Sequence, residues 1–294
     1  MNKAIEFKYA PLIMTLTKIS FSNIPDFKNE SLLAELEKVL RELGYVEKIT
    51  ETEQEIGFEF NSNESDFSQP IPKINKPEKV RYIFRNLERN TSIYLSSGEI
   101  FFKTTAYTTH VDFVKLIGKA IKALINVYPS VQDGAFTAIG TRYVNLIVPK
   151  GDSDLSEYVK PEWYPSILLD VPTLEDEGAH TQIMMNYITG EGGLTIQSLK
   201  FSPKMTDKNL PIILPELADS KETSLIIRSQ AWWDEKLNAK SDYLILDFDL
   251  VKKERKLFNL DDIIESLNNM RKVTKAAFVN CITEKAQIDW EVVK

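Results

Sequence analysis

The strongest constraint on the fold is a pair of long amphipathic stretches, each of which closes a run of short alternating segments. In residues 109–125 and 259–282, apolar side chains recur every three or four positions, which places them on one face of a helix. The segments before each stretch alternate apolar and polar side chains and are separated by turns, which predicts antiparallel strands. We therefore expect an α+β fold, in which an antiparallel sheet carries both long helices on one face.

Residues 1–132 and 133–294 have the same predicted order of elements, strand–helix–four strands–helix. The first half is predicted to have a helix at 32–43 and strands at 10–22, 55–60, 79–86, 91–97 and 99–107. The second half is predicted to have a short helix at 153–159 and strands at 135–149, 180–189, 193–201, 223–233 and 241–251. The same order occurs in each half of the saddle of the TATA-box-binding protein. This resemblance of order implies two pseudo-repeated halves within one compact unit.

Composition narrows the classes of function. The single cysteine, Cys281, excludes an intrachain disulfide, and no apolar run approaches the roughly 18 residues of a membrane span, so we expect a cytoplasmic protein that does not insert into a membrane. Residues 1–132 carry as many acidic as basic side chains, so the net charge of −7 lies entirely in the acidic second half. Nucleic-acid binding is disfavoured, because proteins that wrap phosphates usually have a basic surplus.

One predicted strand carries an arginine on its more apolar face. In residues 135–149, Arg142 shares a face with Val144, Leu146 and Val148. A buried guanidinium needs a carboxylate or several carbonyl partners. Asp247 and Asp249 share a face of the strand 241–251. These aspartates could pair with Arg142 or Arg228, face water, or form a metal or acid–base site. No histidine or third carboxylate lies at a supporting spacing, so we assign no metal ligand.

The candidate interface residues are aromatic or polar. Trp232 and Trp233 lie at the end of the predicted strand 223–233, and adjacent side chains of a strand point to opposite faces. At least one of the two indoles could therefore be exposed, as at many protein interfaces, although both could instead pack in the core. Tyr143 and Asn145, on the strand of Arg142, complete this set of candidates.

Several motifs together resemble a sporadically distributed prokaryotic family of uncharacterised proteins of about this length. They are APLIMTLTKISF near the start, AYTTHVDF before a long helix, the R-Y-x-N strand at Arg142, the paired-aspartate strand LILDFDL and the closing AAFVNCITEKAQIDW. The resemblance covers nearly the whole chain. This sequence has Thr141 where the family usually has leucine. The resemblance implies no particular activity.

No nucleophile elbow, phosphate loop, dinucleotide fingerprint or zinc-protease motif occurs in the sequence, so we expect no catalytic residue and no cofactor. The leading hypothesis is a non-enzymatic protein-binding scaffold, an accessory or sensor component of a prokaryotic defence or regulatory system. One alternative is a metal-dependent hydrolase or nuclease that uses Asp247 and Asp249. A third is a protein that binds nucleic acid through the saddle face. The sequence does not indicate the oligomeric state.

Overall fold

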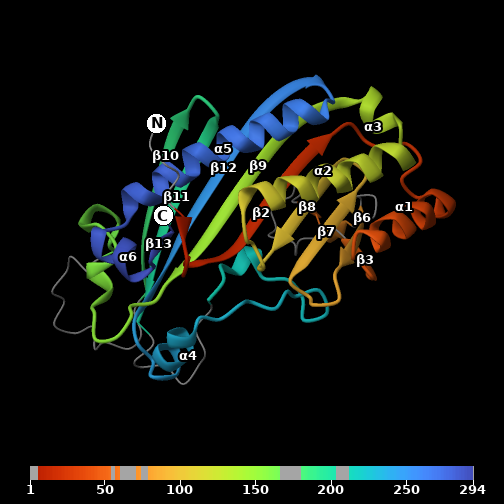
Figure 1. The fold of residues 1–294 in the computed structure, drawn as a ribbon. Coiled ribbons are helices and arrows are strands. Elements are labelled where there is room, and N and C mark those ends of the chain that lie inside the picture. The colour runs from red at the N-terminus through yellow and green to blue at the C-terminus, as the bar shows by residue number, and fades with distance from the viewer. Residues whose placement is uncertain are drawn as a thin grey trace, which may run out of the picture.

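A nine-stranded antiparallel sheet forms the centre of the protein (Figure 1). The computed structural model describes residues 6–53, 57–59, 71–73, 79–165, 180–202 and 212–293. From one edge to the other, the strands follow the order β10-β11-β12-β9-β2-β8-β7-β6-β3. The pairing of β2 with β9 joins the first half of the chain to the second, so one continuous sheet runs through both.

The bounds of the large-sheet strands are β2 (Leu12–Phe21), β3 (Glu47–Glu53), β6 (Lys79–Arg85), β7 (Thr91–Ser96), β8 (Glu99–Thr104), β9 (Ala135–Ile147), β10 (His180–Thr189), β11 (Gly192–Phe201) and β12 (Tyr243–Leu257). Two small sheets pair β1 (Glu6–Phe7) with β13 (Val292–Val293) and β4 (Gly57–Glu59) with β5 (Ile71–Lys73). The α-helices are α1 (Glu30–Glu42), α2 (His110–Val127), α3 (Ser130–Asp133), α4 (Ala231–Asn238), α5 (Leu260–Cys281) and α6 (Glu284–Asp289), and single 3-10 turns are η1 (Leu155–Glu157), η2 (Pro161–Trp163) and η4 (Pro215–Leu217).

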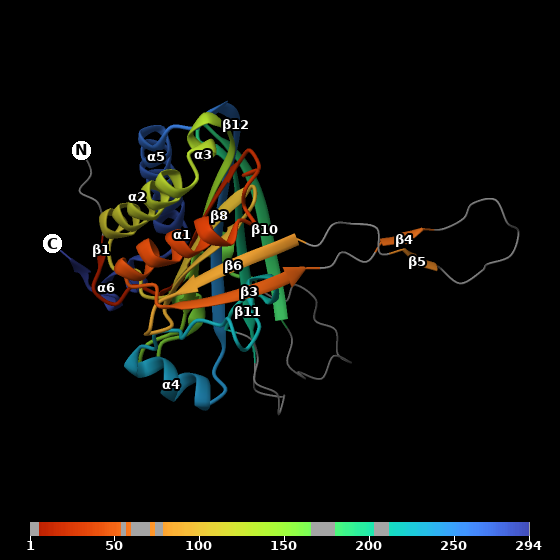
Figure 2. The ribbon, with the colours of Figure 1, turned by 90° about the vertical axis from the view of Figure 1, so that its right-hand side faces the viewer.

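The helices α1, α2 and α5 lie on one side of the sheet, as Figure 2 shows. Each begins at a residue whose side chain accepts hydrogen bonds from the first-turn amides, namely Asn29, Thr109 and Asn259. Their apolar stripes face the sheet and form the main core with residues such as Ile19, Phe102 and Phe248. The prediction of an antiparallel sheet with the long helices on one face is confirmed.

A second, smaller core lies on the opposite face of the sheet. Val144, Leu146 and Val148 are buried there, and Leu214 and Trp233 cover them. This explains the apolar character of the Arg142 side of β9, because α4 and the preceding segment cover part of a face that would otherwise be exposed to water. The sheet is therefore buried on both faces in its central part.

The predicted strand 223–233 is wrong. Residues 212–230, which we call the strap, do not form a strand. They cross the face of the sheet opposite the long helices, which we call the open face, and α4 begins at Ala231. Trp232 and Trp233 accordingly lie on a helix and not at the end of a strand. The strap's backbone carbonyls accept hydrogen bonds from side chains of the sheet, so no strand partner is needed to satisfy them. The second half thus contributes four strands to the sheet, and the first half contributes five.

The order of strands in the first half also differs from the prediction around residue 55. The strand that enters the large sheet is β3, over the charged sequence EKITETE, which the apolar–polar pattern does not indicate. The segment predicted as a strand at 55–60 contains β4, which pairs with β5 in a separate two-stranded sheet; the rest of it lies outside the described residues. The helix predicted at 153–159 is reduced to the single turn η1.

The two ends of the described chain meet, because β1 pairs with β13 beside α6. The aromatic rings of Phe7, Phe278 and Trp290 pack together at this point. Among the described residues, no helix is both long and apolar enough to cross a membrane.

Candidate functional site

Three basic side chains lie on the sheet face opposite the long helices. Arg85 on β6, Lys103 on β8 and Arg142 on β9 retain 4%, 3% and 16% of their side-chain exposure. Burying a cation is costly unless acceptors replace its water. Each of these three cations is therefore expected to contact hydrogen-bond acceptors supplied by the fold.

Arg142 pairs with a carboxylate on the neighbouring strand β12. Its Nε donates to both oxygens of Asp247 at 3.0 Å, and its Nη2 lies 2.7 Å from Asp247 Oδ2. The same Nη2 donates to Glu216 of the strap at 2.8 Å. In the strand register Asp249, and not Asp247, is directly opposite Arg142, so the ion pair is diagonal. The guanidinium thus joins β9, β12 and the strap.

The charges of this pair affect one another. Burial lowers the pKa of Arg142, but the hydrogen bonds and charges of Asp247, Glu216 and Asp249 together outweigh this effect, so the pKa lies above its ordinary value. Burial raises the pKa of Asp247 to about 6, against the opposing effect of Arg142. Burial also raises the pKa of Asp249.

The raised pKa of Asp247 gives a testable pH dependence. Between about pH 4 and pH 6 the folded chain holds a proton that the unfolded chain releases, so this carboxyl's contribution to stability falls as pH rises. Asp247→Asn removes the titration. We expect the stability of this variant, relative to the unmodified protein, to improve by on the order of 2 kcal/mol between pH 4 and pH 7. Urea unfolding across that range measures it.

The exposed Asp152→Asn is the control for this experiment. Its stability difference from the unmodified protein provides the baseline with which the pH trend of Asp247→Asn is compared. A difference for Asp247→Asn that is equally flat would show that Asp247 has an ordinary pKa in the folded state.

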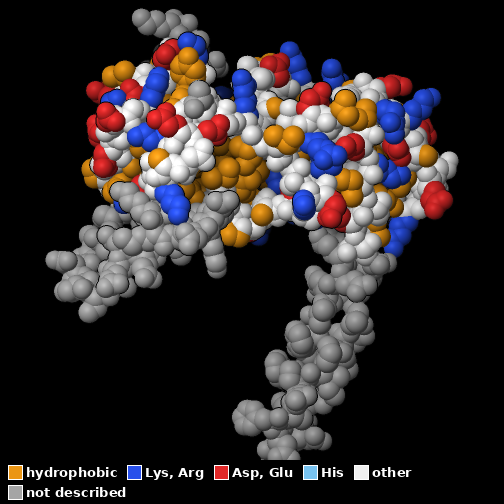
Figure 3. All heavy atoms as spheres, turned by 90° about the horizontal axis from the view of Figure 1, so that it is seen from below, with side chains coloured by type: hydrophobic (Ala, Val, Ile, Leu, Met, Phe, Trp, Pro, Cys, Tyr) orange, Lys and Arg blue, Asp and Glu red, His pale blue; other side chains and the backbone are white. Residues whose placement is uncertain are grey.

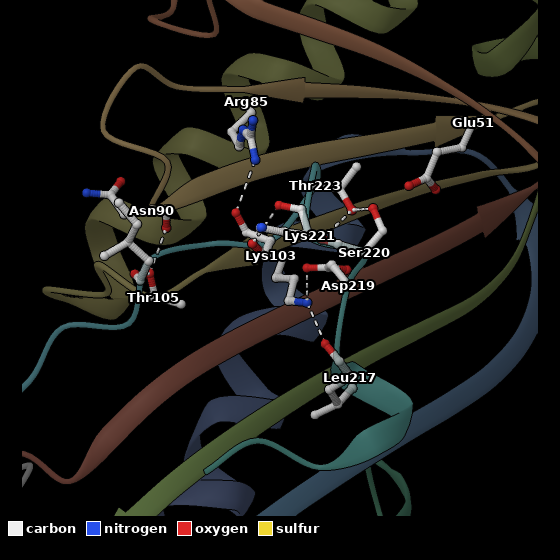
Figure 4. Close-up of polar contacts among 12 residues, drawn as sticks. Glu51, Arg85, Asn90, Lys103, Thr105, Leu217, Asp219, Ser220, Lys221 and Thr223 are labelled. Atoms are coloured by element: carbon white, nitrogen blue, oxygen red, sulfur yellow. Dashed lines mark hydrogen bonds and ion pairs between the residues drawn. The ribbon is translucent and has the colours of Figure 1, made fainter. Parts of the chain in front are cut away.

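Lys103 and Arg85 are covered by the strap (Figure 4). Lys103 Nζ lies 2.5 Å from Asp219 Oδ2 and donates to the carbonyl of Leu217 at 2.7 Å. Arg85 donates to Glu47 of β3 at 2.7 Å and to the carbonyl of Ser224 at 3.1 Å. Burial lowers the pKa of Lys103, and Asp219 opposes that shift. The strap therefore supplies both acceptors of Lys103, one acceptor of Arg85 and, through Glu216, one acceptor of Arg142.

The other residues proposed from the sequence lie apart from this pair. Arg228 is exposed on the strap, and among the described residues no ion pair joins it to either aspartate. Trp233 is buried, and Trp232 is half-buried with its indole Nε1 donating to the carbonyl of Val148 at 3.1 Å. Both indoles pack α4 against the end of β9.

Tyr143 and Asn145 are buried on the helix side of β9. The guanidinium of Arg271 on α5 lies 4.7 Å from the centre of the Tyr143 ring, and Asn145 donates to the carbonyl of Leu246 at 3.0 Å. These two side chains lie beneath the surface that a partner would touch.

The described residues include no group of three or more histidine, cysteine or carboxylate side chains placed to hold a metal ion. Cys281 is buried, and burial raises the pKa of its thiol to about 12, which disfavours the nucleophilic thiolate. The chemistry that the geometry does provide is ion pairing between β9, β12 and the strap.

The two edges of the large sheet differ sharply in character. The outer edge of β3 carries Glu47, Lys48 and Glu51, which form ion pairs with Arg85, Glu37 and Arg81. At the other edge, the ten residues of β10 include no acidic or basic residue other than His180, and no proline. Charged residues and prolines are the usual protection of an edge strand against pairing with another chain. β10 lacks that protection.

Apolar side chains are exposed along β10. Met184, Tyr187 and Ile188 have relative exposures of 51%, 43% and 99%. Within the described part of the chain, no strand pairs with the outer edge of β10. An open hollow of about 610 Å³ beside the β10–β11 turn is lined by side chains that include Asn186, Thr195 and Asp249.

Sequence reasoning had missed the strap and the edge. Glu216, Asp219 and Lys103 stand in segments whose patterns give no sign of their pairing. The signal at β10 was available, because HTQIMMNYIT combines β-forming residues with a complete lack of acidic residues, lysine, arginine and proline.

The chain was compared with family models, with curated proteins and with solved structures, and none of them matches it.

Proposed function

We propose that the protein is a non-enzymatic scaffold that binds a protein partner by strand addition at β10. In this mode an extended segment of the partner forms main-chain hydrogen bonds with an exposed sheet edge. The observation that carries the proposal is the contrast between the charged edge at β3 and the uncharged, partly apolar edge at β10. A protein that only needed to stay monomeric would be expected to protect both edges.

The charges on the open face of the sheet favour a protein over nucleic acid as the binding partner. Its buried cations Arg85, Lys103 and Arg142 are already paired with acceptors from the sheet and the strap. Figure 3 shows blue and red side chains intermingled on the molecule's lower side, without a continuous basic band. Binding to short duplex or single-stranded DNA should accordingly be weak and nearly independent of salt. Tight binding that weakens steeply with salt would favour the nucleic-acid alternative.

We also infer that the two halves of the chain repeat one plan. Outward from the central pair, the first half runs β2, β8, β7, β6 and the second runs β9, β12, β11, β10, and each half ends its strands with a long helix, α2 or α5. This order supports an internal duplication of the kind found in the TATA-box-binding protein saddle. Among the described residues of the second half, no strand stands where β3 stands in the first, so β10 is the edge strand there.

The test compares edge variants in protein purified gently from its own host. Met184→Lys with Ile188→Lys places two charges on exposed positions of β10. A protein that co-purifies at fixed stoichiometry with the unmodified chain should be lost from this variant in native mass spectrometry. Thr50→Lys, at an exposed position of β3, is the matched control and should retain it.

Equal recovery of the partner with both variants would overturn β10 as the binding surface. The proposal as a whole fails if the protein shows a metal-dependent or nucleotide-dependent activity that disappears in the double variant Asp247→Asn, Asp249→Asn.

A further inference from the structure

We propose that the strand added at β10 is β10 of a second copy of this chain. Two copies related by a two-fold axis would pair antiparallel and join their nine-stranded sheets into one. This inference rests on the proposed function, because it names the partner at the same edge. Three features of β10 support it: its charge, its register and its exposed side chains.

The charge of the strand favours self-association at this place. Each chain carries a net charge of −7, so two copies repel one another over most approaches. β10 has neither acidic side chains nor lysine or arginine, and two copies can meet there without like charges coming together. A different partner is commonly selected by complementary charges across the interface, and this edge offers none over its ten residues.

The sequence of β10 is compatible with its own antiparallel copy. Directly opposed residues of an antiparallel pair share a face, so a two-fold axis perpendicular to the sheet must pass midway between two copies of one residue, and we place it at Met184. Met184 then lies opposite the same residue of the second copy. The flanking cross-strand pairs nearest the axis match in character, Gln182 with Asn186 and Ile183 with Met185, whereas the outer pairs, Thr181 with Tyr187 and His180 with Ile188, are mixed.

The exposed apolar side chains lie where this pairing would cover them. Met184 and Ile188 are four residues apart on one face of β10, and Ile188 is almost fully exposed. Contact with a second copy would remove part of the apolar surface of Met184 and Ile188 from water.

The test uses the residue on the proposed axis. The full-length protein should be a dimer by light scattering on a sizing column, with twice the 33.7 kDa chain mass. Met184→Asp and Met184→Lys should each be monomeric, since opposed side chains of a strand pair are only about 5 Å apart and like charges would meet there. An equimolar mixture of the two variants should regain the dimer. Thr50→Asp and Thr50→Lys on β3 should remain dimeric.

A second measurement guards against variants that fail to fold. Met184→Cys should form a disulfide-linked dimer on mild oxidation, because the two copies of residue 184 face each other across the axis. Thr50→Cys should not form one, and the natural Cys281 is buried and does not compete. An unmodified protein that is monomeric over the whole concentration series overturns the inference, and so does a mixture of the charged variants that stays monomeric. A monomer that still loses a host protein on mutation of β10 overturns this inference and leaves the proposed function standing.

Discussion

Arg142→Ala is expected to lower the free energy of unfolding by about 3–5 kcal/mol, because it removes one partner of a buried ion pair. Asp247 retains only 3% of its side-chain exposure, and it would remain buried without the hydrogen bonds that Arg142 donates to both of its oxygens. Glu216 of the strap would also lose its contact with β9. Urea unfolding at pH 7 measures the effect. Arg228→Ala, at an exposed position of the strap, should change stability by less than about 0.5 kcal/mol.

A double variant separates the charge from the packing. Arg142→Met combined with Asp247→Leu replaces the pair by apolar side chains of similar size, which is often neutral or stabilising. We expect it to recover most of the stability that Arg142→Ala loses. An unchanged melting curve for Arg142→Ala, together with lost partner binding, would contradict a structural role for this residue.

Asp219→Ala is expected to cost about 3 kcal/mol, at the low end for a broken buried pair. Lys103 keeps its bond to the carbonyl of Leu217, but its ammonium loses the only carboxylate that it contacts among the described residues. The strap should then detach more often, so limited proteolysis should cut residues 212–230 faster. Glu222→Ala, at an exposed position of the strap, is the matched control and should behave like the unmodified protein.

The cost of Asp219→Ala should shrink as pH rises. Burial already lowers the pKa of Lys103, and loss of Asp219 lowers it further. Between that pKa and the ordinary lysine value of about 10.4, the unfolded chain binds the proton that the folded chain has released, so stability rises with pH. Urea unfolding at pH 7 and at about pH 9.5 tests this. A deficit that grows at the higher pH would show that Lys103 stays charged without Asp219.

The sequence by itself determined the elements whose side chains repeat with a clear period. The stripes of α2 and α5 and the capping residues Thr109 and Asn259 are local features, and they place both helices correctly. The strands β2 and β9 and the first part of β12 were equally clear from alternation, whereas β12 continues beyond the predicted end at residue 251 to Leu257. These patterns also implied one antiparallel sheet with the helices on a single face, because each element shows which side it must bury.

Only the tertiary structure decided which segments joined the sheet. TSLIIRSQAWW has the composition of a strand, yet its backbone is held by Arg85, Thr105 and the carbonyl of Arg89, so it crosses the sheet instead of extending it. EKITETE has too many charges to read as a strand, and it becomes one because β6 supplies matching arginines. Non-local partners outweighed intrinsic preference in both segments.

The candidate site was likewise predictable from the sequence only in part. Alternation along β9 and β12 was enough to put Arg142 on an apolar face and to suggest an aspartate partner. The choice of Asp247 over the directly opposite Asp249 depends on a diagonal contact between strands 105 residues apart in sequence. The strap carboxylates Glu216 and Asp219 reach their cations only because the chain returns across the open face. The local sequence shows the type of each side chain and the face on which it lies. Its interaction partner depends on which distant segments meet in the folded chain.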